Sequence, residues 1–324
     1  MKKIGTTAKG IGPAYADYRQ RKIVRVEDVV NPDNFQRVNQ HMIARLKTYA
    51  RNFDVSKEME EHKFDLQSEM VKYYHAVKWL RDSIKIVDMN KKVRSLLDSN
   101  LPILAEGAQG VMLDITHGDF PNVTSSNTCG FGVFNGLGVG PHDFGALYGV
   151  TKPYVTKVGG GHFVCEMEQA HGQLFQRDGH ERGASTGRPR KCGYPDILLW
   201  RHAIQMHRGF GPMRIIMSKT DIFPEELLGK PFYAITGHKD KNGNISKELQ
   251  LPLTDDMQAV RVEIPSWKTP YDLRVYDETK CRDFDNFVDF MHRELSDLQK
   301  GSFVIDMVGT GPQVGQYFDY PVRY

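Results

Sequence analysis

A repeated alternation of short apolar runs, polar or glycine-rich loops and amphipathic segments constrains the fold of this chain most strongly. Three of the apolar runs end in such loops: Ile103–Ala105, Met213–Met217 and Phe303–Val308. Strand–loop–helix alternation is typical of a largely parallel sheet flanked by helices. We therefore predict an α/β fold with small antiparallel additions, in which polar loops gather at one edge of the sheet.

Apolar residues recur at helical spacing in two long segments, residues 33–51 and 66–99. They make residues 33–99 a mainly helical subregion of what we expect to be a single domain over residues 1–324. Further helices are predicted at residues 144–150, 195–207 and 284–299. Further strands are predicted at residues 153–158, 231–236 and 248–264, with a turn at 241–244.

Composition excludes several classes of protein. The chain has 324 residues with 40% apolar and 26% charged residues, as in ordinary globular proteins. Its net charge of +3 is too small to indicate a nucleic-acid partner. No apolar run is long enough to span a membrane, and we expect no membrane partner. The four cysteines show no metal-site or disulfide spacing, which favours a reducing, cytoplasmic location.

The segment from Glu181 to Asp196 concentrates positive charge in a loop. Its cations are Arg188, Arg190 and Lys191, and the hydroxyls of Ser185 and Thr186 precede them. Proline at position 189 excludes a regular helix. Guanidinium groups bind carboxylates and phosphates through paired hydrogen bonds. The loop is therefore either an anion site for a small acidic substrate or a solvated basic turn.

Glycine-rich and hydroxyl-rich loops supply further anion-binding candidates. Residues 5–12 contain Thr7 among glycines, and residues 123–128 read Val-Thr-Ser-Ser-Asn-Thr. Both can bind phosphate through backbone N–H groups and hydroxyls. Gln109 follows an apolar run and carries both a donor and an acceptor, which suits the edge of a base. The run Gly159–Gly161 allows a backbone to approach a ligand closely.

The strand at 213–217 ends in Ser-Lys-Thr-Asp. Lys219 and Asp221 resemble the base-reading element of GTP-binding proteins, in which the carboxylate accepts hydrogen bonds from guanine. The alternative is an ordinary turn between a strand and a helix. The last apolar run continues into Gly309, Thr310 and Gly311, which would lie at the same edge of a parallel sheet.

Together these motifs resemble the adenylosuccinate synthetase family, in the family's order and at about its spacing from residue 5 to near the C-terminus. The matching segments are Gly5–Tyr15, Glu106–Gly110, Leu113–Gly118, Val123–Thr128, Lys157–Gly161, Gly183–Arg190, Ser218–Asp221 and Gly309–Pro312. The resemblance implies a ligase that joins L-aspartate to IMP in AMP biosynthesis. GTP, as co-substrate, first phosphorylates the 6-oxygen of IMP.

The resemblance also implies roles for individual residues. The IMP-binding residues would be Thr7, Arg21, Gln109, Thr124, Val158 and Arg188. The aspartate-binding residues would be Ser185, Thr186, Arg188 and Arg190. The GTP-binding residues would be Lys219, Asp221, Gly309, Thr310 and Gly311. Arg21 matches an arginine that reaches the IMP phosphate of a partner subunit, which implies a homodimer.

The family's N-terminal segment has no counterpart in this sequence. In the family it carries a phosphate loop, a catalytic histidine and a catalytic aspartate that also binds Mg²⁺. We therefore expect no catalytic residue and no metal ligand in this chain. Two alternatives stay open. One is a viral-type 2-aminoadenylosuccinate synthase acting on dGMP, and the other is a catalytically inactive module that binds a nucleotide or aspartate.

Overall fold

The computed structural model describes residues 7, 9–52, 60–61, 65–184, 187–298 and 301–321. Contacts divide the chain into two compact units. The first unit comprises Met1–Gly10 and Leu104–Tyr324, and the second comprises Ile11–Ile103. The single domain over residues 1–324 and its helical subregion at 33–99 remain predictions.

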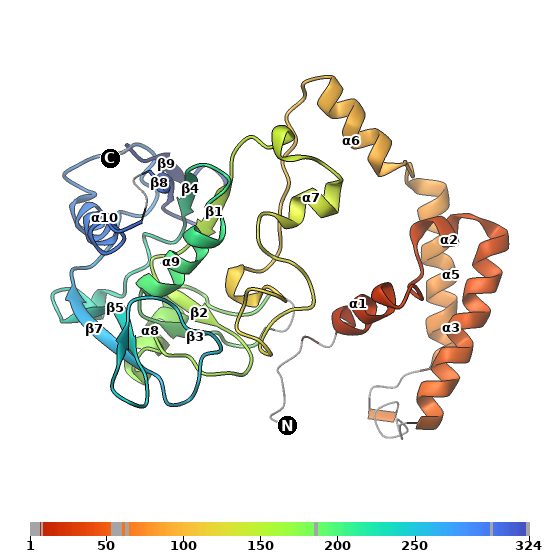
Figure 1. Cartoon of the computed structure of the whole chain (residues 1–324), viewed down its shortest axis with the longest axis horizontal. Coiled ribbons are helices and arrows are strands. Elements are labelled where there is room, and N and C mark those ends of the chain that lie inside the picture. The colour runs from red at the N-terminus through yellow and green to blue at the C-terminus, as the bar shows by residue number, and fades with distance from the viewer. Residues whose placement is uncertain are drawn as a thin grey trace. The chain divides into compact units, whose positions relative to one another are not determined.

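The first unit contains a four-stranded sheet in the order β1-β4-β8-β9 (Figure 1). Its strands are β1 (Tyr148–Thr151), β4 (Met213–Met217), β8 (Phe303–Gly309) and β9 (Tyr317–Asp319). Strands β1, β4 and β8 run parallel, whereas β9 is antiparallel to β8. The three parallel strands therefore end at one edge, and the predicted α/β class with a largely parallel sheet is confirmed.

Two smaller antiparallel sheets belong to the same unit. Strand β2 (Val155–Lys157) pairs with β3 (Lys191–Gly193). Strand β5 (Phe232–Lys239) pairs with both β6 (Ile245–Ser246) and β7 (Gln258–Ile264). They are the small antiparallel additions that the sequence predicts.

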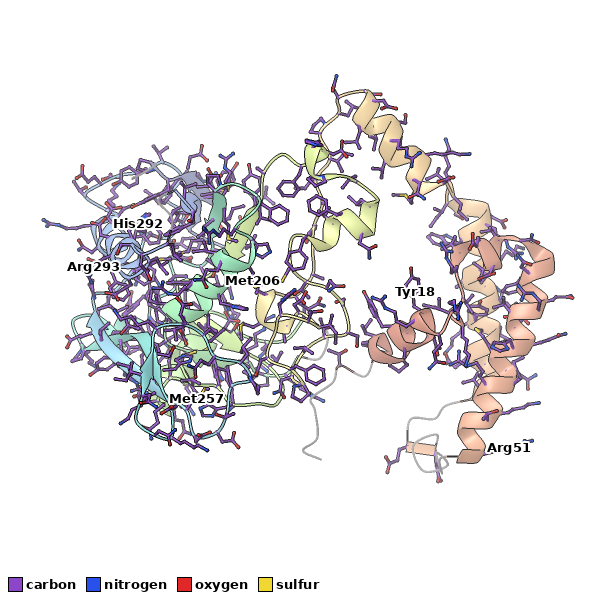
Figure 2. All side chains as sticks on the ribbon, viewed as in Figure 1. Tyr18, Arg51, Met206, Met257, His292 and Arg293 are labelled. Carbon is purple, nitrogen blue, oxygen red and sulfur yellow. The ribbon has the colours of Figure 1, made fainter. Side chains whose placement is uncertain are left out.

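Helices and an aromatic core complete the first unit. The helices are α7 (Gly132–Leu137), α8 (Gln169–Asp178), α9 (Ile197–Met206) and α10 (Arg282–Glu294), with 3₁₀ turns at Val111–Leu113, Pro141–Asp143 and Glu225–Leu227. Asp196 starts α9 by accepting the Leu198 N–H at 3.0 Å. Trp267, Phe232 and Phe287 are fully buried in one hydrophobic cluster. Figure 2 shows the side chains that fill this interior.

The second unit is helical. It contains α1 (Ile11–Arg19), α2 (Val26–Val30), α3 (Pro32–Asn52), α5 (Leu66–Ser83) and α6 (Met89–Asp98). A small core of Val29, Phe35 and Val77 joins α2, α3 and α5. Arg81 donates to the Val29 carbonyl at 2.8 Å and lies 5.1 Å from the Phe35 ring centroid. Tyr18 on α1 is 56% exposed (Figure 2).

The structure corrects the prediction of one helix over residues 66–99. The segment forms α5 and α6, separated at residues 84–88. Asp88 accepts the Lys91 N–H at 3.1 Å and thereby starts a new helix. The apolar periodicity continues across the break because both helices are amphipathic, so spacing alone does not reveal it.

Two further predictions of secondary structure were wrong. Ile103–Ala105 is not a strand: within the described part of the chain it pairs with no strand, and Leu104 is 90% exposed. Residues 144–150 are not a helix, because residues 148–151 form β1 and pair with β4. Gly149 allows this contact, since a β-carbon there would lie 2.8 Å from the Met213 sulfur. Tertiary pairing decided both cases.

The strand predicted over residues 248–264 is shorter in the structure. Only Gln258–Ile264 forms a strand. Pro252 has no N–H for a ladder, which explains why the first part of the segment stays unpaired. The predicted turn at 241–244 is confirmed: the Asp240 carboxylate accepts the Asn242 and Asn244 N–H groups at 2.8 Å each.

All four cysteines are free and buried. Among the described helices, none combines the length and apolar character required to cross a bilayer.

Candidate functional site

The ends of β4 and β8 bring two predicted GTP-binding segments together. Thr220 donates to the Gly309 carbonyl through its N–H at 3.2 Å and its hydroxyl at 3.1 Å. A β-carbon on Gly309 would lie 3.3 Å from the Ser218 Cα, so glycine permits this close approach. The turn at 218–221 and the loop at 309–311 are therefore neighbours because parallel strands end at the same edge.

Lys219 and Asp221 occupy distinct environments in this turn. Lys219 has a left-handed backbone with φ +59°, and its Nζ donates to the Gly179 carbonyl at 2.7 Å. Asp221 is half-buried, and burial raises the pKa of its carboxyl although Lys219 opposes that shift. Asp221 lines a cleft of about 560 Å³ whose other lining residues are Arg177, Asp178, Ile222, Phe223, Glu225, Glu226 and Lys268.

Thr310 and Gly311 shape the neighbouring loop. The Thr310 side chain is fully buried and donates to the Leu273 carbonyl at 2.8 Å. A β-carbon on Gly311 would lie 2.4 Å from Gln316 Oε1, the atom that accepts the Gln313 N–H at 2.7 Å. The Thr310 hydroxyl therefore faces the protein, and its N–H and carbonyl also bond within the protein, to the Gln316 carbonyl and the Asp272 N–H at 2.9 Å each.

The cationic loop is a hairpin. Arg182 and Pro189 form an isolated antiparallel β-bridge, and the Gly183 N–H donates to the Arg188 carbonyl at 2.8 Å. Gly187 has φ +64°. The left-handed backbone at Gly187 suits a tight turn. Arg188, the residue after Gly187, is exposed. Ser185 and Thr186 lie outside the described residues.

Strand pairing brings the glycine run beside the cationic hairpin. Lys157, the last residue of β2, lies opposite Lys191, the first residue of β3. Val158 follows Lys157, and Arg190 precedes Lys191, so both lie next to this pair. Val158 is 47% exposed, as a residue that contacts a ligand needs to be.

Asp114 organises the loop that carries Gln109 and Thr124. Its buried carboxylate accepts four backbone N–H groups, from Thr116, His117, Thr128 and Cys129, at 2.6–3.3 Å. Burial alone would raise the pKa of Asp114, but these hydrogen bonds lower it. The Thr124 N–H bonds the Leu113 carbonyl at 2.9 Å. The Asp114 carboxylate therefore holds residues 116–117 and residues 128–129 of this loop together.

Backbone strain marks three of the predicted site residues. Six non-glycine residues among those described have positive φ, and Arg21, Gln109 and Lys219 are three of them, at +60°, +62° and +59°. Such conformations cost about 1–3 kcal/mol and cluster at functional sites. Thr7 and Arg21 are both exposed. Thr7 belongs to the first unit, and Arg21 belongs to the second.

Sequence reasoning missed Glu181 as a functional candidate. Its Oε1 accepts hydrogen bonds from Lys152 at 2.9 Å, Tyr154 at 2.7 Å and Lys219 at 2.8 Å, and its Oε2 accepts one from Arg190 at 3.3 Å. Its side chain is 1% exposed. Burial alone would raise the pKa of Glu181, but the hydrogen bonds from Lys219 and Lys152 lower it to about 2. The signal in the sequence that could have identified it was a single acidic residue beside a run of basic residues.

Metal ligands do not gather in this part of the chain. Among the residues that the structure describes, no three His, Cys, Asp or Glu side chains are close enough to hold a metal ion.

The fold defines an α/β protein whose candidate site lies at the carboxyl ends of parallel strands, the edge where ligands bind in open α/β folds. The family model for adenylosuccinate synthetase matches residues 1–318, and the chain belongs to this family of ligases in purine biosynthesis. It is 36% identical over 323 residues to adenylosuccinate synthetase of Parabacteroides distasonis. This match covers 99% of this chain and 70% of that protein.

Two further relatives agree. Adenylosuccinate synthetase of Bacteroides fragilis is 35% identical over 311 residues, covering 96% of this chain and 68% of that protein. The solved structure of fully ligated adenylosuccinate synthetase from Plasmodium falciparum is similar with a TM-score of 0.77 and 27% identity. That match covers 98% of this chain and 70% of the other.

Proposed function

We propose that this chain is an adenylosuccinate synthase that ligates L-aspartate to IMP with GTP. GTP transfers its γ-phosphoryl group to the 6-oxygen of IMP. The aspartate amine then attacks C6, phosphate leaves and the amine loses a proton. Membership of the family supports this proposal. The observation that carries it is that the turn at Lys219–Asp221 lies beside Gly309 and is linked to the cationic hairpin, because Lys219 and Arg190 both donate to Glu181.

Asp221 and Lys219 are the proposed guanine-reading pair. The Asp221 carboxylate would accept hydrogen bonds from the guanine N1–H and 2-amino group, and the Lys219 stem would lie along the ring. The cleft of about 560 Å³ beside Asp221 has room for a base. Gly309, Thr310 and Gly311 would lie close to the nucleotide.

The cationic hairpin is the proposed aspartate site. Arg188 and Arg190 would bind carboxylates of L-aspartate, and Ser185 and Thr186 would add hydroxyl donors. Arg–carboxylate pairs are among the stronger hydrogen-bonded contacts because donor and acceptor are both charged. The hairpin geometry supports the assignment, since it fixes the backbone on either side of the tip.

The IMP site is proposed on the adjoining loops. Gln109 would contact the purine edge, and Thr7 and Thr124 would bind the 5′-phosphate. Val158 would line the ribose pocket, with Arg188 close by. Holding reactants in line removes much of the entropic barrier, and fixed donors offset repulsion among the anions.

We also propose a homodimer in which Arg21 reaches the IMP phosphate of the partner subunit. Arg21→Leu should then raise the concentration of IMP needed, and mixing it with Arg188→Leu should restore part of the activity. No restoration in the mixture would contradict a shared site. We propose the cytosol as the compartment, since free thiols persist in reducing surroundings.

Phosphate release tests the proposed reaction. The purified chain is incubated with GTP, Mg²⁺, IMP and L-aspartate, and each is then omitted in turn. Release that requires all of them would show that the chain ligates aspartate to IMP by itself, whereas binding of IMP or aspartate without release would support the inactive binding module. Release that continues without IMP or without aspartate would refute the ligation, and release with dGMP in place of IMP would support the viral-type substrate.

Base discrimination tests the guanine site separately. Asp221→Asn should weaken GTP binding by about ten-fold or more, because an amide nitrogen would face the guanine N1–H donor. The same variant should gain affinity for xanthosine triphosphate, whose 2-oxygen accepts a hydrogen bond. Asp178→Asn is the matched control, since this acid lines the same cleft but pairs with Arg177. Unchanged GTP affinity in Asp221→Asn would remove its assigned role.

A further inference from the structure

Glu181 connects two segments that lie far apart in the sequence. Lys219 comes from the turn after β4, and Arg190 comes from the cationic hairpin before β3. Both donate to the same carboxylate, at 2.8 Å to Oε1 and 3.3 Å to Oε2. The carboxylate is buried, whereas the Lys219 and Arg190 side chains remain 36% and 34% exposed. Each cation is therefore anchored on its protein side and open on the other.

The backbone fixes Glu181 before any ligand binds. It follows the turn that ends α8, where its N–H bonds the Gln176 carbonyl at 3.0 Å and its carbonyl accepts the Arg190 N–H at 2.9 Å. Gly179 permits this turn, because a β-carbon there would lie 2.5 Å from the Tyr154 hydroxyl. Tyr154 in turn donates to Glu181 at 2.7 Å. Lys219 and Arg190 are thus held by a rigid acceptor.

The charge balance of the cluster favours anions. One carboxylate faces Lys152, Lys219 and Arg190, so the cluster carries an excess of positive charge. Lys152 is directed inward, with its Nζ on Glu181 and on the Thr156 hydroxyl at 2.8 Å. The excess charge is therefore presented by Lys219 and Arg190. Charges in a partly buried site interact more strongly than in water.

From this geometry we infer that Glu181 is a positioning residue that orients Arg190 for the dicarboxylate substrate and Lys219 for the guanine nucleotide. The inference rests on the proposed function. It predicts that the two affinities fall together when Glu181 loses its charge. IMP affinity stays nearly constant, since Gln109 and Thr124 lie on a loop that Asp114 holds independently.

Glu181→Gln tests the inference, with Glu166→Gln as the matched control. Glu166 pairs with Lys191 at 2.9 Å on the same hairpin, but both side chains are exposed. We expect Glu181→Gln to weaken binding of GTP, and of L-aspartate in the presence of GTP and IMP, each by about ten-fold or more. IMP affinity should change by less than about two-fold. Glu166→Gln should match the unmodified chain.

Two outcomes would overturn the inference. Unchanged GTP and aspartate affinities with a lower melting temperature would assign Glu181 a structural role only. Tighter aspartate binding would mean that Glu181 competes with the substrate for Arg190. Glu181→Asp keeps the charge but shortens the side chain, so it should weaken the binding of both ligands to an intermediate degree. It replaces Glu181→Gln in the test if that variant does not fold.

Hydrogen exchange without ligands separates this inference from the proposed function. Glu181→Gln should accelerate exchange in the peptides that contain Arg190 and Lys219, beyond any change in Glu166→Gln. If Glu181→Gln accelerates exchange but the unmodified chain binds neither GTP nor aspartate, the proposed function is contradicted. Glu181 then still anchors both segments. Equal exchange in the two variants would overturn the anchoring itself.

Discussion

Asp114→Asn tests whether one buried carboxylate holds the proposed IMP loop. In the structure Oδ1 accepts the Thr116 and His117 N–H groups, and Oδ2 accepts those of Thr128 and Cys129. Asparagine has the same shape but only one amide oxygen. Its amide nitrogen would therefore face two backbone donors.

The expected loss follows from those contacts. A hydrogen bond to a charged group contributes about 1.5–3 kcal/mol, so losing two of them should lower the free energy of unfolding by about 3 kcal/mol. The side chain is 0% exposed, so water does not replace the lost acceptor. The pKa of Asp114 is lowered on folding. Its stabilisation is therefore present above the unfolded pKa and is lost as pH falls through the folded value.

Urea unfolding at neutral pH measures the loss as a shift of the midpoint at constant slope. Asp240→Asn is the control, since Asp240 accepts backbone N–H groups through one oxygen in an exposed turn, and its other oxygen accepts the exposed Asn244 side-chain amide. We expect its midpoint to stay unchanged. An equal midpoint in Asp114→Asn and the unmodified chain would refute the argument. IMP affinity should fall with stability in Asp114→Asn, because both arms of the loop loosen.

Three further predictions concern the site. Gln109→Gly should lower IMP affinity by about ten-fold while changing the free energy of unfolding by less than about 1 kcal/mol, because glycine suits its φ of +62°; equilibrium titration and urea melts together check this, and unchanged IMP affinity would contradict it. Arg188→Leu should weaken aspartate binding by about 2–3 kcal/mol, as expected for a lost charge-assisted pair; a steady-state titration that shows the same dependence on aspartate would remove this role. The folded pKa of Glu181, about 2, lies below the usual 4.5. Its stabilisation should therefore be complete above pH 4.5 and disappear as pH falls toward 2, and melting temperatures of Glu181→Gln should lack that acid-induced loss.

Local patterns in the sequence determined the fold class and most of the elements. The runs at 213–217 and 303–308 form β4 and β8, in which buried residues largely alternate with more exposed ones, as in strands with one face on the core. The polar residues after them, Lys219 to Asp221 and Gly309 to Gly311, meet as expected, since parallel strands end at one edge. Pro189 marked a loop correctly, because proline restricts the backbone wherever it stands.

The tertiary structure alone decided which residues act together. Tyr148–Thr151 became a strand because β4 lies beside it, and Ile103–Ala105 stayed unpaired. The link between Lys219 and Arg190 passes through Glu181, which follows α8 and is 38 residues away from Lys219. A hydrogen bond depends on distance and burial in the folded chain, whereas sequence patterns report spacing within one element. Glu181 therefore appeared in the sequence only as an acid beside a basic run.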